Sequence, residues 1–272
     1  MSDPVSRFSN RADNYAKYRP SYPAAVLDIL RSGCGLTETE TIADVGSGTG
    51  ILSELFLKNG NQVIGIEPNA AMRQAAERLR ERFAKFVSIE ATAETTSLEA
   101  ASVDFITAGQ AFHWFDRGRA KPEFARILKP GGWVVLIWNE RRLDSTPFLR
   151  DYEKLLVHYG TDYAQVRHEN VEGEIAQFFA PEAFQLKTIE NVQHFDFESL
   201  KGRTRSASYT PEPGHTNFLP MFTELEEIFN ANKRDGMISF EYDTRIYYGH
   251  LPPLRNANRY HATRAARAGT PG

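Results

Sequence analysis

The chain has 272 residues, of which 41% are hydrophobic and 25% charged, and this composition excludes a disordered, collagen-like or coiled-coil protein. Its length predicts one enlarged domain, or a core domain that carries a smaller insertion. A net charge of −3 gives no general attraction to nucleic acid, so a small-molecule partner is expected. The longest apolar run, 133–138, is too short to span a bilayer, and no membrane partner is expected. Residues 1–7 lack the apolar stretch of a secretory signal and Cys34 is the single cysteine, so a cytoplasmic location is expected.

From residue 41 onward, short β-branched runs alternate with segments of helical spacing. Strands are predicted at 41–45, 62–66, 86–91, 103–108 and 133–138, and helices at 50–59, 69–83 and 119–128. The segment 129–132, Lys-Pro-Gly-Gly, is predicted to end the last of these helices. Such regular alternation predicts an α/β fold, with a mostly parallel sheet and helices on both of its faces.

The pattern changes after residue 140. Residues 141–183 are predicted to be helical, and two β-rich runs at 184–197 and 239–248 are predicted to bring the sheet to seven strands. Between them the sequence predicts a loop and a helix at 220–232. The helical segments are expected to cap the carboxyl edge of the sheet, where open α/β sheets bind ligands.

The chain is accordingly divided into five segments. These are an N-terminal helical cover (1–40), a ligand-binding core (41–140), a helical cap insertion (141–183), closing strands with a lid loop (184–254) and a basic tail (255–272). The tail carries four arginines and no acidic residue, which is compatible with a solvated terminus or with a contact to nucleic acid.

The most informative motif is Asp-Val-Gly-Ser-Gly-Thr-Gly at 44–50, between a predicted strand and a predicted helix. Its glycines permit unusual backbone angles and let a ligand approach the main chain. A dinucleotide fingerprint needs a small residue at position 51, and Ile51 therefore counts against NAD and FAD. Glu67 ends the second predicted strand, 21 residues after Gly46, and its carboxylate can accept hydrogen bonds from both hydroxyls of a ribose. A ligand with a free ribose diol is expected.

These features resemble class I S-adenosylmethionine-dependent methyltransferases of the type 11 domain, whose first motif is an acidic residue, any residue, and then G-x-G-x-G. In that family the position of Glu67 binds the ribose, and the segment 91–94 surrounds the adenine, although Thr92 stands where many relatives have Asp. The segment 128–132 is similar to the family's L-K-P-G-G turn. Segments 8–23 and 109–116 resemble a small-molecule branch that includes trans-aconitate methyltransferase. The resemblance implies a Rossmann-like methyltransferase fold, with S-adenosyl-L-methionine as cofactor and S-adenosyl-L-homocysteine as product.

The resemblance also implies a set of site residues. The expected cofactor-binding residues are Arg19, Asp44, Gly46, Ser47, Gly48, Gly50, Glu67, Pro68, Thr92, Ala93, Glu94, Gly109 and Gln110. The expected substrate-pocket residues are Tyr18, Tyr22, Trp114, Asn139, Arg203 and Tyr209. Asp44 is expected to compensate the ammonium of the cofactor's methionine end, and Arg19 to bind its carboxylate or a carboxylate of the substrate.

His113 is the candidate catalytic residue, since a histidine just beyond the fourth predicted strand can act as a general base. Its alternative role is to support the loop of Trp114. Arg203 and Tyr209 belong to a basic, hydroxyl-rich loop that would suit an acidic or polar substrate. No metal site is expected, because the sequence has no His-x-x-x-His pair or cysteine cluster.

The leading hypothesis is an enzyme that methylates a small molecule on oxygen, nitrogen or carbon, with a carboxylate acceptor favoured by the resemblance. One alternative is a methyltransferase of RNA, DNA or protein, although residues 109–112 lack the Asn/Asp-Pro-Pro-Tyr/Phe segment of nucleic-acid amino methyltransferases. Another is a catalytically silent protein that binds the cofactor. The sequence leaves the acceptor open, and also the choice between a monomer and a homodimer.

Overall fold

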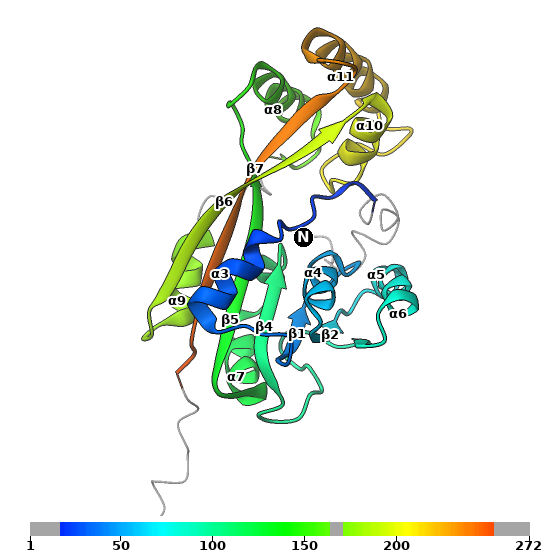
Figure 1. Ribbon diagram of the computed structural model, residues 1–272. Coiled ribbons are helices and arrows are strands. Elements are labelled where there is room, and N and C mark those ends of the chain that lie inside the picture. The colour runs from blue at the N-terminus through cyan, green and yellow to red at the C-terminus, as the bar shows by residue number, and fades with distance from the viewer. Residues whose placement is uncertain (1–16, 164–170, 253–272) are drawn as a thin grey trace, which may run out of the picture.

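A computed structural model describes residues 17–163 and 171–252, and Figure 1 shows how their elements are arranged. Seven strands form one sheet in the order β3-β2-β1-β4-β5-β7-β6. Their bounds are β1 Thr41–Val45, β2 Gln62–Ile66, β3 Phe86–Ile89, β4 Val103–Gly109, β5 Leu128–Arg141, β6 Phe184–Phe195 and β7 Ile238–Gly249. β7 runs antiparallel to both of its neighbours, and the other paired strands are parallel. The predicted seven-stranded, mostly parallel sheet is confirmed.

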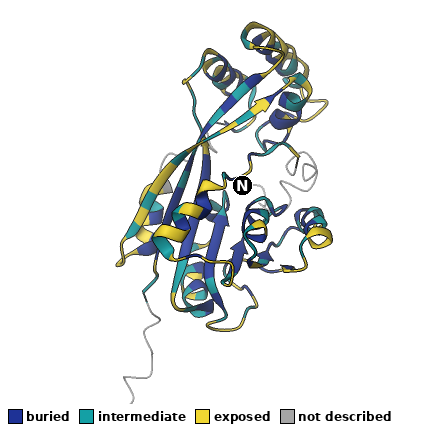
Figure 2. Ribbon diagram, in the orientation of Figure 1, coloured by how far each residue is buried: buried dark blue, intermediate teal, exposed yellow. Residues whose placement is uncertain are grey.

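Helices cover both faces of the sheet, and each face buries its own apolar cluster. One cluster joins the sheet to α3 (Ala25–Cys34), α4 (Ile51–Asn59), α5 (Ala70–Ala76) and α6 (Arg78–Arg82). The opposite cluster joins it to α7 (Arg117–Ile127) and α9 (Val171–Phe179). Figure 2 shows the central strands as mostly buried, with exposed residues alternating along the edge strand β6. Such burial on both sides explains why the central strands are continuous apolar runs in the sequence.

β6 and β7 extend beyond the rest of the sheet into a cap (Figure 1). The cap helices are α8 (Pro147–Tyr159), α10 (Phe197–Arg205) and α11 (Phe218–Asn232). A third apolar cluster joins these three helices to the first residues of β7, among them Phe240 and Tyr242. The cap is thus anchored on the extended ends of β6 and β7 rather than on a flexible linker.

Three predicted elements differ from the structure. The helix predicted at 69–83 is divided into α5 and α6, because Arg80 N bonds to the carbonyl oxygen of Glu77 in a tight turn, 2.9 Å away. The segment 129–132 is not a separate turn but part of β5, at a register shift opposite β4. The lid loop after β6 is largely α10, which begins where the Asp196 side chain accepts a hydrogen bond from Ser199 N at 2.8 Å. The residues 1–16 of the expected N-terminal cover and the basic tail 255–272 lie outside the described residues.

Candidate active site

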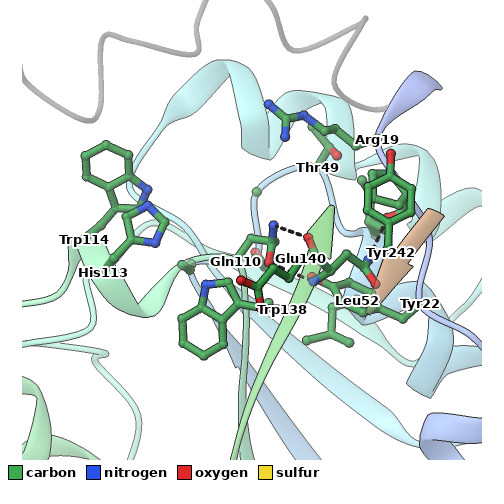
Figure 3. A pocket seen from close by; sticks show the side chains of 18 of the residues that line it. Arg19, Tyr22, Thr49, Leu52, Gln110, His113, Trp114, Trp138, Glu140 and Tyr242 are labelled. Carbon is green, nitrogen blue, oxygen red and sulfur yellow. Dashed lines mark hydrogen bonds between the residues drawn. The ribbon is translucent and has the colours of Figure 1, made fainter. Parts of the chain in front are cut away.

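A cavity of about 660 Å³ opens at the carboxyl ends of β1, β2, β4 and β5, between the sheet and the cap. The order of strands reverses between β1 and β4, which is where open α/β sheets place their ligands. The structure brings to this cavity fourteen of the predicted site residues: Arg19, Tyr22, Asp44, Gly46, Ser47, Gly48, Glu67, Gly109, Gln110, His113, Trp114, Asn139, Arg203 and Tyr209. Figure 3 shows His113 and Trp114 on one side of it and Tyr22 and Tyr242 on the other.

The remaining predicted residues do not line this cavity: Tyr18, Gly50, Pro68, Thr92, Ala93 and Glu94. Gly50 instead caps α4 with φ +82°, and a Cβ atom there would overlap the side chain of Leu79. Glu94 is directed to another partner, since its carboxylate accepts a hydrogen bond from Asp116 N at 2.8 Å. The ring of Tyr18 lies against Gly202 of α10. Their assignments to cofactor or substrate therefore lack support from the cavity.

The glycine loop presents open backbone to the cavity at Gly48. Its φ is +56°, and a Cβ built there would meet no atom within 4 Å. Gly48 N donates to one carboxylate oxygen of Glu67 at 2.9 Å, and Asn69 N donates to the other at 2.9 Å. Burial raises the pKa of Glu67, while these two backbone donors oppose the rise. Each oxygen keeps a lone pair for a further donor, so Glu67 can receive two hydroxyl groups while it holds the loop.

Asp44 is completely buried at the end of β1. Its carboxylate accepts hydrogen bonds from the hydroxyls of Ser53, at 2.6 Å, and Thr107, at 3.1 Å. Burial nevertheless raises the pKa of Asp44 to about 7, since the two hydroxyls and the backbone N–H of Ser53 replace only part of the lost hydration. A cation beside this carboxylate would favour its charged form.

Gln110 joins the ends of β4 and β5. Its φ of +55° is unusual for a residue with a side chain, and such conformations are retained where surrounding contacts hold them. The Gln110 side chain accepts from Asn139 N at 3.0 Å and donates to Asn139 O at 3.4 Å. This pairing directs the chain from Gln110 into the short helix Phe112–Trp114, where the rings of His113 and Trp114 are 4.6 Å apart.

Asn139 also connects the segment before α3 to the sheet. Its amide nitrogen donates to Ser21 O at 3.4 Å, and its amide oxygen accepts from the hydroxyl of Thr244 at 2.5 Å. Nearby, the hydroxyl of Tyr22 lies against Gly109, where a Cβ would come within 2.5 Å of it. Asn139 therefore lines the cavity while its polar atoms serve the protein, and Tyr22 is packed into the wall.

Sequence reasoning missed several residues that line the cavity. The Thr49 hydroxyl and the Trp138 indole N–H are buried and have no hydrogen-bond partner among the described residues. Thr49 lies inside the glycine motif, so its position in the motif could have identified it as a residue of the site. Arg141 and Tyr242 face each other where β5 pairs with β7, Tyr163 reaches Arg141 from the segment after α8, and no local motif marks the three.

Two further findings bear on the chemistry. Within residues 17–163 and 171–252, no cluster of three or more His, Cys, Asp or Glu side chains is arranged to hold a metal ion. In the same ranges, no helix has the length and apolar character needed to cross a membrane.

The comparison with known protein families agrees with the position of the cavity. Residues 43–136, which contain the glycine loop and β1 to β5 up to Leu136, match a family model described as a methyltransferase domain. This stretch of the chain is similar to a methyltransferase domain. An uncharacterized methyltransferase of Mycobacterium tuberculosis is 36% identical over 134 residues, which cover 49% of this chain and 52% of the relative. One of Schizosaccharomyces pombe is 31% identical over 150 residues, or 55% and 58% of the two chains. The chain thus spans little more than half the length of these curated relatives.

Solved structures extend the likeness to the whole fold. A protein from Anaeromyxobacter dehalogenans, described as a type II methyltransferase, has a TM-score of 0.64 at 20% identity and covers 87% of this chain and 99% of its own. Phosphoethanolamine N-methyltransferase 2 of Haemonchus contortus has a TM-score of 0.51 at 16% identity and covers 90% and 57%. The expected Rossmann-like methyltransferase fold is confirmed, and the narrower likeness to the trans-aconitate branch stays a prediction.

Proposed function

We propose that this protein transfers a methyl group from S-adenosylmethionine to a small-molecule acceptor. The observation that carries the proposal is the cavity, in which the glycine loop, Asp44 and Glu67 of the methyltransferase domain face a wall formed by the cap. The likeness to an enzyme solved in complex with phosphomonomethylethanolamine and S-adenosylhomocysteine supports both the cofactor and a small acceptor.

The residues present fit the proposed cofactor. The open side of Gly48 leaves room for a ligand against the main chain, where any side chain would intrude. Glu67 has lone pairs left for the two ribose hydroxyls, and the buried hydroxyl of Thr49 needs a partner. Asp44 would compensate the ammonium and Arg19 would bind the carboxylate of the methionine end.

When bound, S-adenosylmethionine supplies a methyl group on a sulfonium, and its transfer breaks the carbon–sulfur bond and leaves a neutral thioether. The protein's task is then to align the acceptor and to exclude water. Trp138 and the cap residues Tyr209 and Tyr242 form a wall suited to both. His113 would take the proton of an acceptor hydroxyl or amine. A carboxylate acceptor has no such proton, so His113 would then act only as support for Trp114.

The division of labour among segments is part of the proposal. Residues 41–140 would bind the cofactor, while 1–40, 141–183 and 184–254 would cover it and shape the acceptor pocket. A cavity beneath a cap favours a small acceptor over a macromolecule, because a base or a side chain of a folded partner would have to pass beneath the cap.

Calorimetric titration of the purified protein with S-adenosylmethionine and, in parallel, with NAD tests the cofactor. We expect binding of S-adenosylmethionine alone, and its loss in Gly48→Arg, whose side chain would fill the ligand space. Gly131→Arg is the matched control. Gly131 has a φ of +79° and an equally open Cβ position, but it is exposed and does not line the cavity. Absence of binding to the wild type would overturn the methyltransferase proposal.

A transfer assay then separates an enzyme from a silent binding protein. Small acids, phenols and amines are incubated with methyl-labelled cofactor, and RNA and a protein extract serve as macromolecular acceptors. Label in a small molecule supports the proposal, whereas label only in RNA or protein, or none despite cofactor binding, contradicts it. With an amine or phenol, His113→Ala should lower kcat by about 10²-fold or more. The same variant should leave transfer to a carboxylate nearly unchanged.

A further inference from the structure

Arg203 of α10 is a buried cation at the cap end of the cavity. Its exposed fraction is 5%, and it lines the cavity wall. Its Nε donates to the hydroxyl of Tyr242 at 3.3 Å. Within the described part of the chain, no carboxylate lies within 4.0 Å of its guanidinium, and Nη1 has no hydrogen-bond partner. A guanidinium placed in this way retains a buried donor that no acceptor among the described residues satisfies.

Two other arginines of the cavity have carboxylate partners. Arg141 forms an ion pair with Glu153 and donates to the hydroxyl of Tyr163 at 3.0 Å. Arg245 lies between Glu140, at 3.3 Å, and Glu172, at 3.2 Å. Carboxylates on α8, β5 and α9 thus reach these two arginines, whereas the described residues supply none to Arg203.

The groups that do surround Arg203 are aromatic and neutral. Its Cζ lies 5.6 Å from the centre of the Phe240 ring. Burial raises the pKa of Tyr152, so this neighbouring phenol carries no charge at neutral pH. Burial of a charge is costly unless hydrogen bonds and an opposite charge accompany it. Arg203 therefore has the properties of a site that is completed by an anion.

Arg141 supplies a second donor to the same place. Its Cζ lies 5.2 Å from the centre of the Tyr152 ring, and the ring of Tyr152 is 4.9 Å from that of Phe240, over which Arg203 lies. The Nη1 atom of Arg141 is also buried without a hydrogen-bond partner among the described residues. Two arginines thus converge on the cap end of the cavity.

The opposite end of the cavity is acidic, because Asp44 and Glu67 lie beside the glycine loop. A cavity of this polarity can hold a cationic ligand at the sheet and an anionic one at the cap. The same arrangement would keep an anionic acceptor from occupying the cofactor end.

Resting on the function proposed above, we propose that the methyl acceptor carries an anionic group, a carboxylate or a phosphate, that is bound by Arg203 together with Arg141. The planar guanidinium can bind either group through two parallel hydrogen bonds. Hydrogen bonds to a guanidinium withdraw electron density from the oxygens that accept them, so the anchored anion serves recognition and the methylated atom is another atom of the acceptor. Arg203 is then a specificity-determining residue.

The first test needs no substrate. The unfolding temperature is measured in acetate, benzoate, glutarate or inorganic phosphate, each at 20 mM and at constant ionic strength adjusted with sodium chloride. We expect at least one of these anions to raise the unfolding temperature of the wild type. Arg203→Met should abolish that shift. Arg203→Lys should reduce it, because lysine keeps the positive charge but cannot form the two parallel hydrogen bonds of a guanidinium. Arg205→Met is the matched control, since Arg205 is exposed on the same helix and does not line the cavity.

The result assigns the anion and can overturn the proposal. A shift with the carboxylates alone indicates a carboxylate, and one with phosphate alone a phosphate. The proposal is wrong if no anion acts on the wild type, or if Arg203→Met and Arg203→Lys respond as the wild type does. In the transfer assay, each accepted acid is compared with its neutral amide. With the wild type, the KM of the amide should be at least tenfold higher than that of the acid. With Arg203→Met, the two KM values should be similar.

Calorimetry with S-adenosylmethionine on the same variants separates the two proposals. Retained cofactor binding without any effect of anions overturns the anionic acceptor and leaves the methyltransferase proposal intact. If the wild type does not bind S-adenosylmethionine, the methyltransferase proposal is wrong, whatever the effect of the anions.

Discussion

Asp44 lies wholly buried beside the cavity, where its carboxylate accepts hydrogen bonds from two hydroxyls and forms no ion pair with any residue that the structure describes. Burial raises its pKa to about 7. An unfolded chain would release the proton of an aspartic acid near pH 4. Between about pH 4 and 7 the folded state therefore holds a proton that the unfolded state has lost.

This difference predicts how stability depends on pH. Stability falls as pH rises wherever the folded state binds more protons. The free energy of unfolding of Asp44→Asn should not fall in this way, because asparagine cannot ionise. Between about pH 4 and 7, the free energy of unfolding of the variant should therefore increase relative to that of the wild type by up to about 1.4 kcal/mol per pH unit. Urea unfolding of both proteins from pH 4 to 8 measures it. Parallel curves would contradict a raised pKa.

A second residue-scale prediction compares two carboxylates of α8. Glu153 is 15% exposed and pairs with Arg141, whereas Asp151 is 42% exposed and pairs with Lys154. Glu153→Ala leaves a buried guanidinium without its partner, and we expect a loss of about 3 kcal/mol in the free energy of unfolding. Asp151→Ala removes a surface pair and should cost under about 1 kcal/mol. Similar losses from both variants, measured by denaturant unfolding, would be inconsistent with a buried pair in the cap.

At the scale of elements, α10 shows where local patterns lose their meaning. Its sequence is polar, with Leu200 as its one aliphatic residue, and we predicted a loop there. The helix forms because Asp196 caps it and because Gly202, Arg203 and Thr204 are buried against the cap. A helix that buries polar residues gives no apolar periodicity, so the sequence could not indicate it.

Gly202 offers a test of that packing. In a helix interior, Gly→Ala ordinarily stabilises by about 1 kcal/mol. Here an added Cβ would overlap the ring of Tyr18, which lies on the segment before α3. We therefore expect Gly202→Ala to lower the unfolding temperature and to expose the chain near Tyr18 to limited proteolysis. Gly118→Ala, whose Cβ would meet only ordinary contacts in α7, should do neither, and equal effects of both variants would argue against the Tyr18 contact.

At the scale of the whole molecule, the core was predictable and the cap end of the site was not. Strands β1 and β2 match their predicted bounds, because a buried parallel strand is a local apolar run with turn residues at each end. The glycine loop follows from β1 by sequence adjacency. Arg141, Tyr163 and Tyr242 meet only through the pairing of β5 with β7 and the folding of the cap over both. Contacts between distant segments of this kind leave no spacing in the sequence that could be recognised.

This division of the molecule predicts two separate patterns of protection from hydrogen exchange. S-adenosylhomocysteine should slow exchange in the glycine loop 46–50 and around Glu67 while it leaves α10 nearly unchanged, because its proposed contacts, apart from Arg19, are with the core. An anion that raises the unfolding temperature should instead protect α10 and the end of β5 near Arg141. At 100 times its Kd, either ligand stabilises the folded state by about 2.7 kcal/mol, so globally exchanging amides should slow in both cases, and only the locally exchanging ones distinguish the two ends. The opposing outcome is that S-adenosylhomocysteine, added without an anion, protects α10 as strongly as the glycine loop. That result would mean that the cap contacts the cofactor and that the two ends are not separate sites.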